Sequence, residues 1–227
     1  QADVVFAVSQ PLHDYCKQLN SEAFLVPNGT DTLLAGMVAT VPKDLGNIRH
    51  PVLGYVGAIF DKLDFELLSY VAREHPEWSI LMIGPVGAAS LGVEKQISSL
   101  KEMSNVMFLG AKHREALPGY YEAIDVALMP YELTEHTEHI FPLKMFEYMA
   151  FRKPIVSTDI PAVREFSEVI SIARNPAQFV DGISRLLDGD NRQRLQRGFE
   201  IAQESSWDNR VEEISQIIHS RLFKEAR

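Results

Sequence analysis

The chain has 227 residues, of which 46% are hydrophobic, so it can build one large domain or two small ones around a core. Its formal net charge of −9 argues against a nucleic-acid partner, because proteins that bind a phosphate backbone carry clustered basic residues. The single cysteine, Cys16, excludes an internal disulfide, and no apolar run approaches the roughly 20 residues that span a bilayer. We therefore expect a cytoplasmic protein without a transmembrane segment, which could still lie against a membrane as part of a longer chain.

The first part of the chain predicts two short strands separated by one helix. Residues 4–8, VVFAV, are a continuous apolar run that is typical of a strand buried on both faces. Ser9 can cap the helix that follows, and residues 23–26 form a second apolar run before Pro27. Residues 40–50 show no clear period, which indicates a linker or a hinge.

A regular alternation of strands and helices begins at Pro51. The expected strands cover residues 52–56, 79–83, 106–109, 126–129, 155–157 and 169–172. The expected helices cover residues 63–74, 93–103, 117–123, a stretch that opens at 141–142, 162–166, 176–187, 192–204 and 207–223. Such alternation predicts an α/β fold with a Rossmann-like parallel sheet of about six strands and helices on both faces.

Three of the expected strands end in glycine, at Gly57, Gly84 and Gly110. The carboxyl ends of parallel strands meet at one edge of the sheet, and open α/β sheets bind their ligands at that edge. Any one of these glycines can be explained as the turn of a tight loop. Three at one edge favour a ligand crevice.

The stretch FPLKMFEYMAFRKP predicts a helix that opens at Phe141–Pro142. Pro142 suits the first helical position, and the free N–H groups there, with the positive end of the helix dipole, attract an anion. Lys144 opposes the dipole, which a bound diphosphate would compensate, and Glu147 lies one turn deeper on the same face. Phosphates on the N–H groups and ribose hydroxyls on the carboxylate would suit a nucleotide. An ordinary amphipathic helix with a Lys–Glu surface pair is the alternative.

Other basic residues follow the strands. Lys62 could reach a phosphate from the loop after the first glycine, and Lys112 and His113 could line a base or phosphate pocket after the third. Solvated surface charge explains both groups as well. His136 and His139, in EHTEH, indicate a solvated loop rather than a metal site, because no third ligand is near. The chain has no G-x-G-x-x-G after a strand and no Walker loop.

Several stretches carry a family resemblance. They are ADVVFAVS and VPNGTD at residues 2–9 and 26–31, VMFLG at 106–110, YYEAIDVALMPY at 120–131, PLKMFEYMAFRKPIVST at 142–158, and Ser206-Trp207 before a last helix. Together they resemble the C-terminal, donor-binding domain of GT-B glycosyltransferases, close to glycosyltransferase family 4. The resemblance implies a nucleotide-sugar donor, UDP- or GDP-linked, with no metal and no other cofactor, because the helix dipole and basic side chains neutralise the departing diphosphate.

The resemblance also implies roles for particular residues, with Glu147 holding the ribose hydroxyls and the amides of Leu143 and Lys144 holding the diphosphate. The donor-binding set that it implies is Gly57, Lys62, Gly84, Gly110, Lys112, His113, Phe141, Pro142, Leu143, Lys144 and Glu147. The family's pattern has another glutamate eight residues before Glu147, where this chain has His139. Glu138 is adjacent and could substitute, so Glu138 and His139 are the candidate catalytic residues.

Two further departures from the family's pattern concern basic residues. The usual Arg and Lys pair after the first strand is reduced to Lys62, and the glycine after the helix is replaced by Arg152. These departures leave the stereochemistry of transfer open between retention and inversion.

The resemblance divides the chain into parts. Residues 1–38 are expected to be a remnant of an N-terminal acceptor domain, 39–50 a linker, 51–206 the donor-binding domain and 207–227 a C-terminal helix. The first strand begins within a few residues of Gln1, as expected of a piece of a longer protein whose missing N-terminal domain would be a partner. The unpaired strand edges in residues 1–38 predict either a dimer through this segment or visible disorder.

The function that follows from the resemblance is sugar transfer from a nucleotide-sugar to a glycan, lipid or other acceptor. The PxK-x-x-E form of the helix is similar to a subgroup that acts on cell-surface polysaccharides such as teichuronic acid. Alone, this part of the enzyme is expected to bind donor weakly and to transfer little. The alternative is a nucleotide- or sugar-binding module without catalysis, which His139 in place of the glutamate favours.

Overall fold

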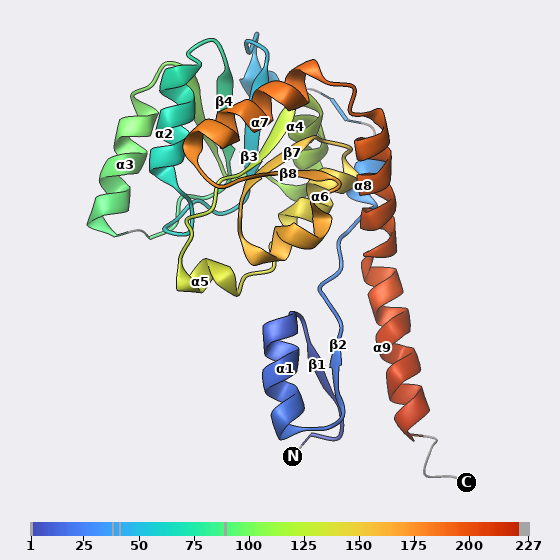
Figure 1. The fold of residues 1–227 in the computed structure, drawn as a ribbon. Helices are drawn as coiled ribbons and strands as arrows, with labels where there is room; N and C mark the ends of the chain where they lie inside the picture. The colour runs from blue at the N-terminus through green and yellow to red at the C-terminus, as the bar shows by residue number, and fades with distance from the viewer. Residues whose placement is uncertain (1, 38, 41, 89, 223–227) are drawn as a thin grey trace.

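The computed structural model describes residues 2–37, 39–40, 42–88 and 90–222, and its largest part is an α/β fold (Figure 1). Six parallel strands form one sheet in the order β5-β4-β3-β6-β7-β8. They are β3 (Val52–Val56), β4 (Ser79–Ile83), β5 (Val106–Gly110), β6 (Val126–Met129), β7 (Ile155–Thr158) and β8 (Ile170–Ala173). The predicted Rossmann-like sheet of about six parallel strands is confirmed.

The central strands are apolar runs because helices cover both faces of the sheet. Every residue of β3, β4, β6 and β7 is buried, as expected for a parallel sheet with two covered faces. Gly54 in β3 lies under Ile124, and a Cβ at this position would come within 2.2 Å of that side chain. The glycine in the middle of this strand therefore makes room for packing rather than forming a turn.

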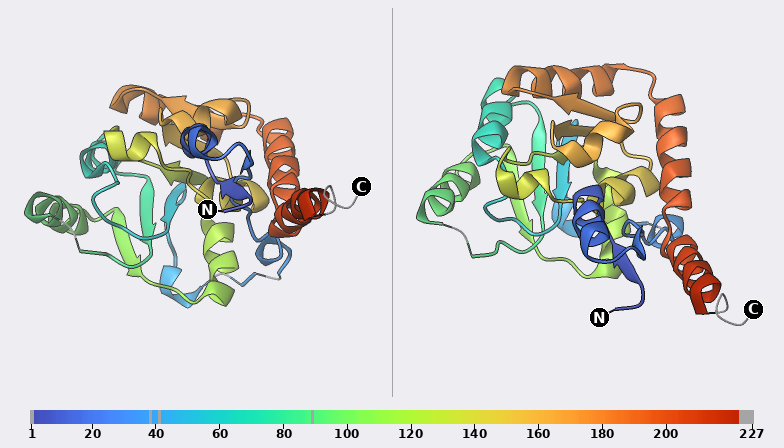
Figure 2. Two further views of the ribbon diagram at one scale, coloured as in Figure 1. Left: turned by 90° about the horizontal axis from the view of Figure 1, so that it is seen from below. Right: turned by 60° about the horizontal axis from the view of Figure 1, so that its bottom comes forward.

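Two sets of helices cover the sheet (Figures 1 and 2). One face carries α2 (Phe65–Glu74), α3 (Leu91–Lys101) and α7 (Pro176–Asp188), and the other carries α4 (Leu117–Ala123), α6 (Lys144–Ala150) and α8 (Arg192–Glu204). The helix expected from residue 63 begins at Phe65, because Asp64 caps it and accepts the N–H of Leu67 at 2.7 Å. The short helix expected at 162–166 is a 3₁₀ helix, η4 (Pro161–Phe166).

Helix α6 begins later than the sequence predicts. The carbonyl of Leu143 is the first to accept an N–H four residues on, from Glu147, whereas the carbonyl of Pro142 accepts only from Met145, three residues on. Pro142 therefore lies before the helix and not at its first position, and Leu143 is the N-cap. Lys144 is the first residue of the helix, so its placement in the first turn is correct.

Helix α6 is followed by a residue in the left-handed backbone conformation, Arg152. This conformation explains why the pattern of the resembling family has glycine at this position. Arg152 has φ 50°, its N–H donates to Met149, and the N–H of Lys153 donates to Tyr148. This is the Schellman arrangement, which favours glycine at the left-handed position. The guanidinium of Arg152 stacks 3.6 Å above the ring of Phe199 on α8, a contact that glycine could not make.

The expected loop at residues 132–140 contains one helical turn, α5 (Glu135–Glu138). Thr134 and Thr137 form a reciprocal capping box, in which each side chain bonds the other residue's backbone. Thr137 is buried, and its hydroxyl also donates to the carbonyl of Glu132. The polar composition of this stretch thus serves local hydrogen bonding, which fixes α5 at the carboxyl edge of the sheet.

Residues 2–31, the N-terminal segment, lie apart from the main sheet (Figures 1 and 2). Strands β1 (Val5–Ala7) and β2 (Ala23–Leu25) pair with each other in parallel, and α1 (Gln10–Leu19) joins them. Helix α1 buries none of its residues, and Leu19 is 73% exposed. Within the described residues, β1 has no place in the main sheet. The assignment of this segment to a missing acceptor domain stays a prediction, as does a dimer through it.

The chain passes at one place from the N-terminal segment into the part that contains the six-stranded sheet, here called the main part. It passes back out at the same place. The N–H of Thr30 donates to Ser205 at 2.8 Å, and the N–H of Trp207 donates to Thr30 at 3.1 Å. From Trp207, helix α9 (Trp207–Leu222) runs beside the N-terminal segment, where Arg221 pairs with Glu22 at 2.7 Å. No helix of the described chain combines the length and the apolar character that a membrane crossing needs.

The stretch expected as a linker packs against the main part. The 3₁₀ helices η1 (Leu34–Gly36) and η2 (Lys43–Leu45) belong to this region, and Leu45 is buried. The carbonyl of Thr40 lies so close to Gly119 of α4 that a Cβ there would come within 2.2 Å of it. The carboxylate of Asp44 accepts the hydroxyl of Tyr120 at 2.7 Å. Asp44 and Leu45 are therefore held against the main part, and the role of residues 39–50 as a linker or hinge stays a prediction.

Candidate functional site

Three glycines turn the chain at the carboxyl edge of the sheet. Gly57, Gly84 and Gly110 have φ angles of 146°, 145° and 68°, a region that side chains with a Cβ rarely adopt. A Cβ on Gly84 would lie 2.0 Å from the carbonyl oxygen of Gly57, so the ends of β3 and β4 approach closely. Gly57 lines the pocket described next, whereas Gly84 and Gly110 shape the edge without lining it.

A pocket of about 470 Å³, here the basic pocket, lies at this edge. Its walls come from the end of β3, the loop before α2, helix α5 and the start of α6. It is lined by Val56, Gly57, Phe60, Lys62, Leu117, Tyr121, Tyr131, His136, Ile140, Phe141, Pro142, Leu143, Lys144 and Glu147. The site residues Gly57, Lys62 and those from Phe141 to Lys144, with Glu147, therefore come together as the sequence predicts.

Two lysines in the basic pocket lack an anionic partner within the described chain. The ammonium of Lys144 lies 5.1 Å from the ring centroid of Tyr55, and that of Lys62 lies 4.7 Å from the ring centroid of Phe60. Burial lowers the pKa of Lys144 to about 8, the nearby charge of Lys62 adds to this shift, and Glu147 opposes it. Burial also lowers the pKa of Lys62. Two half-buried cations that disfavour each other would be stabilised by a bound anion.

Backbone donors lie beside these cations. The N–H groups of Leu143 and Lys144 open helix α6, and neither has an acceptor among the described residues. Together with Lys62, Lys144 and His136, they give the basic pocket the donors that phosphate oxygens require.

Glu147 lies on the wall that the basic pocket shares with a second pocket. The hydroxyl of Tyr121 donates to one carboxylate oxygen of Glu147 at 2.9 Å. Burial raises the pKa of Tyr121 well above its ordinary value, so the hydroxyl keeps its proton. The Tyr121 ring is itself held by stacking on Phe151, with centroids 4.2 Å apart. This arrangement fixes the carboxylate and leaves its other oxygen for a ligand.

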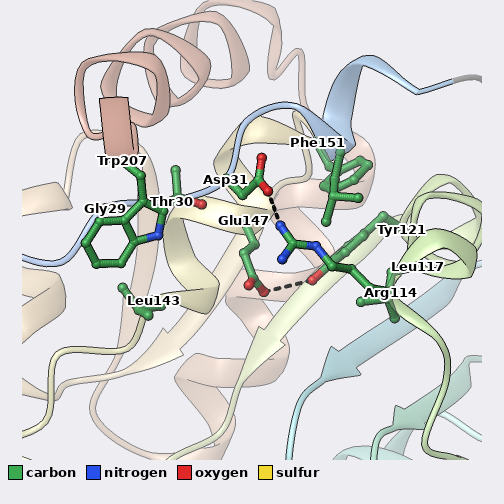
Figure 3. Close-up of a pocket in the computed structure, with 11 residues that line it drawn as sticks. Gly29, Thr30, Asp31, Arg114, Leu117, Tyr121, Leu143, Glu147, Phe151 and Trp207 are labelled. Carbon is green, nitrogen blue, oxygen red and sulfur yellow. Dashed lines mark hydrogen bonds and ion pairs between the residues drawn. The ribbon is translucent and has the colours of Figure 1, made fainter. Parts of the chain in front are cut away.

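The second pocket, here the hinge pocket, has a volume of about 230 Å³ (Figure 3). It is lined by Gly29, Thr30, Asp31, Leu34, Arg114, Leu117, Tyr121, Leu143, Glu147, Phe151 and Trp207. Asp31 forms an ion pair with Arg114 across it. Thr30 is only 3% exposed, and its hydroxyl has no hydrogen-bond partner within the described chain. The hinge pocket thus combines aromatic walls with polar groups.

The structure does not bring Lys112 and His113 to either pocket. The ammonium of Lys112 donates to Asp44 at 2.6 Å, and this hydrogen bond raises the pKa of Lys112 and lowers that of Asp44. His113 is exposed and precedes the 3₁₀ helix η3 (Arg114–Ala116). Arg114, the next residue along the chain, lines the hinge pocket instead. Asp44 is distant in sequence, so only the fold could distinguish the three residues.

The candidate catalytic residues Glu138 and His139 also lie outside the basic pocket. Both are exposed at the end of α5 and line a third pocket, against the N-terminal segment. His136, on the same short helix, lines the basic pocket, whereas the sequence predicts only a solvated loop at this position. The motif EHTEH contained all three side chains, but the capped turn decides which pocket each one lines. A catalytic role for Glu138 and His139 stays a prediction.

Comparison with known proteins identifies the class. A family model described as glycosyl transferases group 1 matches residues 50–189. Sucrose-phosphate synthase from Thermosynechococcus elongatus has a similar structure, with a TM-score of 0.71 and 20% identity over 99% of this chain. HepE from Anabaena, solved in complex with UDP and glucose, aligns over 96% of this chain with a TM-score of 0.70 and 20% identity. These structures support the GT-B glycosyltransferase fold.

The family match covers more than half of the chain, so the protein belongs to the group 1 glycosyl transferases. A relative from Bacillus subtilis (strain 168), TuaH, is named as a teichuronic acid biosynthesis glycosyltransferase and is 35% identical over 117 residues, 52% of this chain. The chain spans only part of these proteins: 29% of TuaH, 59% of the synthase and 63% of HepE. Membership of glycosyltransferase family 4 in particular stays a prediction.

Proposed function

We propose that this chain forms the nucleotide-sugar donor site of a glycosyltransferase that acts in the synthesis of a cell-surface polysaccharide. The observation that carries the proposal is the pair Lys62 and Lys144, two ammonium groups without an anionic partner in the described chain, in the same pocket as the carboxylate of Glu147. An anion and a diol on neighbouring groups of one molecule would satisfy this arrangement. A nucleoside diphosphate carries both.

The positions of the pockets suggest how such a donor would lie. Its diphosphate would occupy the basic pocket, on Lys62, Lys144 and the open N–H groups of α6. The ribose hydroxyls would bond to the free oxygen of Glu147, on the wall shared by both pockets. The base and the diphosphate are attached at opposite ends of the ribose. With the diphosphate in the basic pocket, the base would therefore extend toward the hinge pocket and its aromatic walls.

The same groups would assist the chemistry. Transfer of the sugar leaves a nucleoside diphosphate whose negative charge grows as the glycosidic bond breaks. Cations and N–H donors that are already in place stabilise that charge without reorganisation. Lys62, Lys144 and His136 would serve in this way, which compensates for the arginine that is missing beside Lys62.

The names of relatives support the substrate class. TuaH is named for teichuronic acid biosynthesis, and the structure of HepE holds UDP and glucose. We therefore take a UDP-sugar as the first donor to test, with a GDP-sugar as the second. The acceptor, the identity of the sugar, and a cytoplasmic or membrane-peripheral location stay predictions.

Calorimetric titration of uridine, UDP, guanosine and GDP into this chain tests the proposal. We expect one diphosphate to bind at least tenfold more tightly than its nucleoside, because only the diphosphate reaches the two lysines. Lys144→Ala should reduce that ratio without abolishing it, since Lys62 and the N–H groups remain. Equal affinity for nucleoside and diphosphate, or no binding of either at millimolar concentration, would contradict the donor site.

A nucleotide-binding module without catalysis is the second candidate. His139 at the position of the family's glutamate favours it, because imidazole is a different acid and base from a carboxylate. Release of UDP from UDP-glucose, measured on this chain joined to an acceptor-binding domain, separates the two. Turnover supports the transferase, and tight binding without turnover supports the module.

A further inference from the structure

Tyr131 lines the basic pocket, although it is not in the donor-binding set that the sequence implies. It follows β6 at the carboxyl edge of the sheet, and it is only 1% exposed. Its hydroxyl has no hydrogen-bond partner among the described residues, yet this oxygen is not one of the sealed, partnerless atoms of the fold, such as the hydroxyl of Thr30. The small surface that the hydroxyl keeps therefore belongs to the wall of the basic pocket.

Other buried tyrosines near this pocket use their hydroxyls within the fold. The hydroxyl of Tyr55 donates to the carbonyl of Ala58 at 3.0 Å. The hydroxyl of Tyr148 accepts the N–H of Val56, also at 3.0 Å. A phenol that is buried without such a bond is unfavourable, and a ligand atom that bonds to Tyr131 would remove that cost.

Backbone contacts hold Tyr131 in place before any ligand binds. Its N–H donates to the hydroxyl of Thr158 on β7 at 3.1 Å, and that hydroxyl donates to the carbonyl of Tyr131 at 2.9 Å. On the other side, Tyr131 forms a β-bridge with Leu63, and the N–H of Glu132 donates to the carbonyl of Lys62 at 3.0 Å. The phenol and the ammonium of Lys62 therefore reach the pocket from two segments that are bonded to each other.

The surroundings of the Tyr131 hydroxyl indicate which ligand atom it would meet. Burial raises the pKa of Tyr131 well above its ordinary value, so the hydroxyl keeps its proton and can donate. The ammonium of Lys62 lies 5.8 Å from the centroid of the Tyr131 ring, so an acceptor beside this ring is favoured when it carries negative charge. An oxygen of a diphosphate meets both conditions.

We propose that Tyr131 is a further donor-binding residue, whose hydroxyl donates a hydrogen bond to the diphosphate that Lys62 and Lys144 attract. The proposal rests on the proposed function, because it adds a contact to the same site. A phenol contributes a directed bond without a third positive charge, in a pocket where two cations already disfavour each other. The same bond would strengthen during transfer, as negative charge grows on the departing diphosphate.

Calorimetric titration of uridine, UDP and UDP-glucose into the wild-type chain and Tyr131→Phe tests this contact, since the substitution removes one oxygen and keeps the ring. We expect UDP and UDP-glucose to bind about tenfold more weakly, as for the loss of a hydrogen bond to a charged group. Uridine should bind unchanged, because it carries no diphosphate. The melting temperature should not fall, since the hydroxyl makes no bond within the described chain. Tyr70→Phe, on α2, is the matched control and should leave all three affinities unchanged.

The outcomes separate this contact from the donor site itself. If the wild-type chain binds UDP more tightly than uridine and Tyr131→Phe binds UDP equally well, the Tyr131 contact is wrong and the donor site stands. If only UDP-glucose is weakened, the hydroxyl meets the sugar, and its assignment to the diphosphate is overturned. A lower melting temperature, with uridine weakened as much as UDP, would make the hydroxyl structural. If the wild-type chain binds none of the three, the donor site and the Tyr131 contact fail together.

Discussion

The main part and the N-terminal segment contribute to the same pockets but are held in different ways. Phe65 on α2 and Phe146 on α6 are buried in a continuous core, whereas helix α1 buries no residue and Tyr15 is 62% exposed. The lysines and Glu147 are therefore positioned by a packed fold before any ligand arrives. Thr30 and Asp31 depend on a few polar contacts at the crossing. The pocket residues of the main part should therefore keep their positions when the N-terminal segment is changed.

The largest expected effect comes from a change inside the main part. Gly84→Ala should destabilise the fold by about 3 kcal/mol or more, because the new Cβ would overlap the carbonyl of Gly57 and the φ of 145° suits only glycine. Gly87→Ala, in the same loop, is the control, since its Cβ would meet only ordinary contacts and should change stability by less than about 1 kcal/mol. Equal denaturation midpoints for the two variants would contradict the close approach of β3 and β4.

The next effect concerns binding rather than folding. Glu147→Ala should weaken the binding of UDP by about 1.5–3 kcal/mol, the range for hydrogen bonds to a charged group. Its melting temperature should change little, because the carboxylate faces the pockets. Unchanged affinity in calorimetry would remove Glu147 from the site, and a large loss of melting temperature would instead make its bond with Tyr121 structural.

Lys144 tests whether burial of its ammonium group lowers the stability of the empty protein. The pKa of about 8 lies below the ordinary value of 10.5, so the folded state releases a proton that the unfolded state still holds between these pH values. Wild-type stability should therefore rise as pH increases from 8 toward 10.5. Lys144→Met should stabilise the empty protein by roughly 1–3 kcal/mol at pH 7, and this gain should vanish near pH 10.5. A gain that is independent of pH would exclude this cause.

His136 and His139 lie close together in sequence but line different pockets, so their substitutions test which of them contacts the donor. His136→Ala should weaken the binding of UDP by about 1 kcal/mol, because it would remove one polar contact to the diphosphate. His139→Ala is the matched control and should leave UDP affinity unchanged, since that ring lines the pocket against the N-terminal segment. The reverse result, by calorimetry, would place His139 in the donor site.

The smallest effect is expected at the crossing itself. Asp31→Asn removes an ion pair with Arg114 whose arginine is largely exposed, so the melting temperature should fall by an amount equivalent to about 0.2–1 kcal/mol. The loss should disappear at high salt, because screening already weakens exposed pairs. A cost well above this range would show that the two regions are coupled more tightly than their contacts indicate.

The sequence was sufficient to predict the sheet and only part of the site. Runs such as residues 52–56 are apolar because both faces of the sheet are covered, and a local pattern carries that information. Lys62 and Glu147 follow the strands whose ends meet, so their shared edge could be predicted. Lys112 could not be placed, because the Asp44 that binds it arrives from a distant segment.

The boundary errors have local causes. Pro142 is compatible with a first helical position, and only the hydrogen bonds of Pro142 and Leu143 show that the helix starts later. The hinge pocket had no sequence signature, because residues 29–31 and Trp207 meet only where the chain crosses twice. The role of each site residue in binding stays a prediction until titration.

The paired crossing at Thr30 and Ser206 has a topological consequence. Because the chain enters and leaves the main part through adjacent, hydrogen-bonded backbone, this part is an insertion whose two ends meet. Such a unit can be excised or circularly permuted with a short connection, without stretching the sheet. The remaining elements, β1, α1, β2 and α9, meet at the same crossing. Their contacts with one another do not depend on the length of the inserted part. Recombination at this one point could exchange the main part between related chains while the N-terminal segment and α9 stay intact.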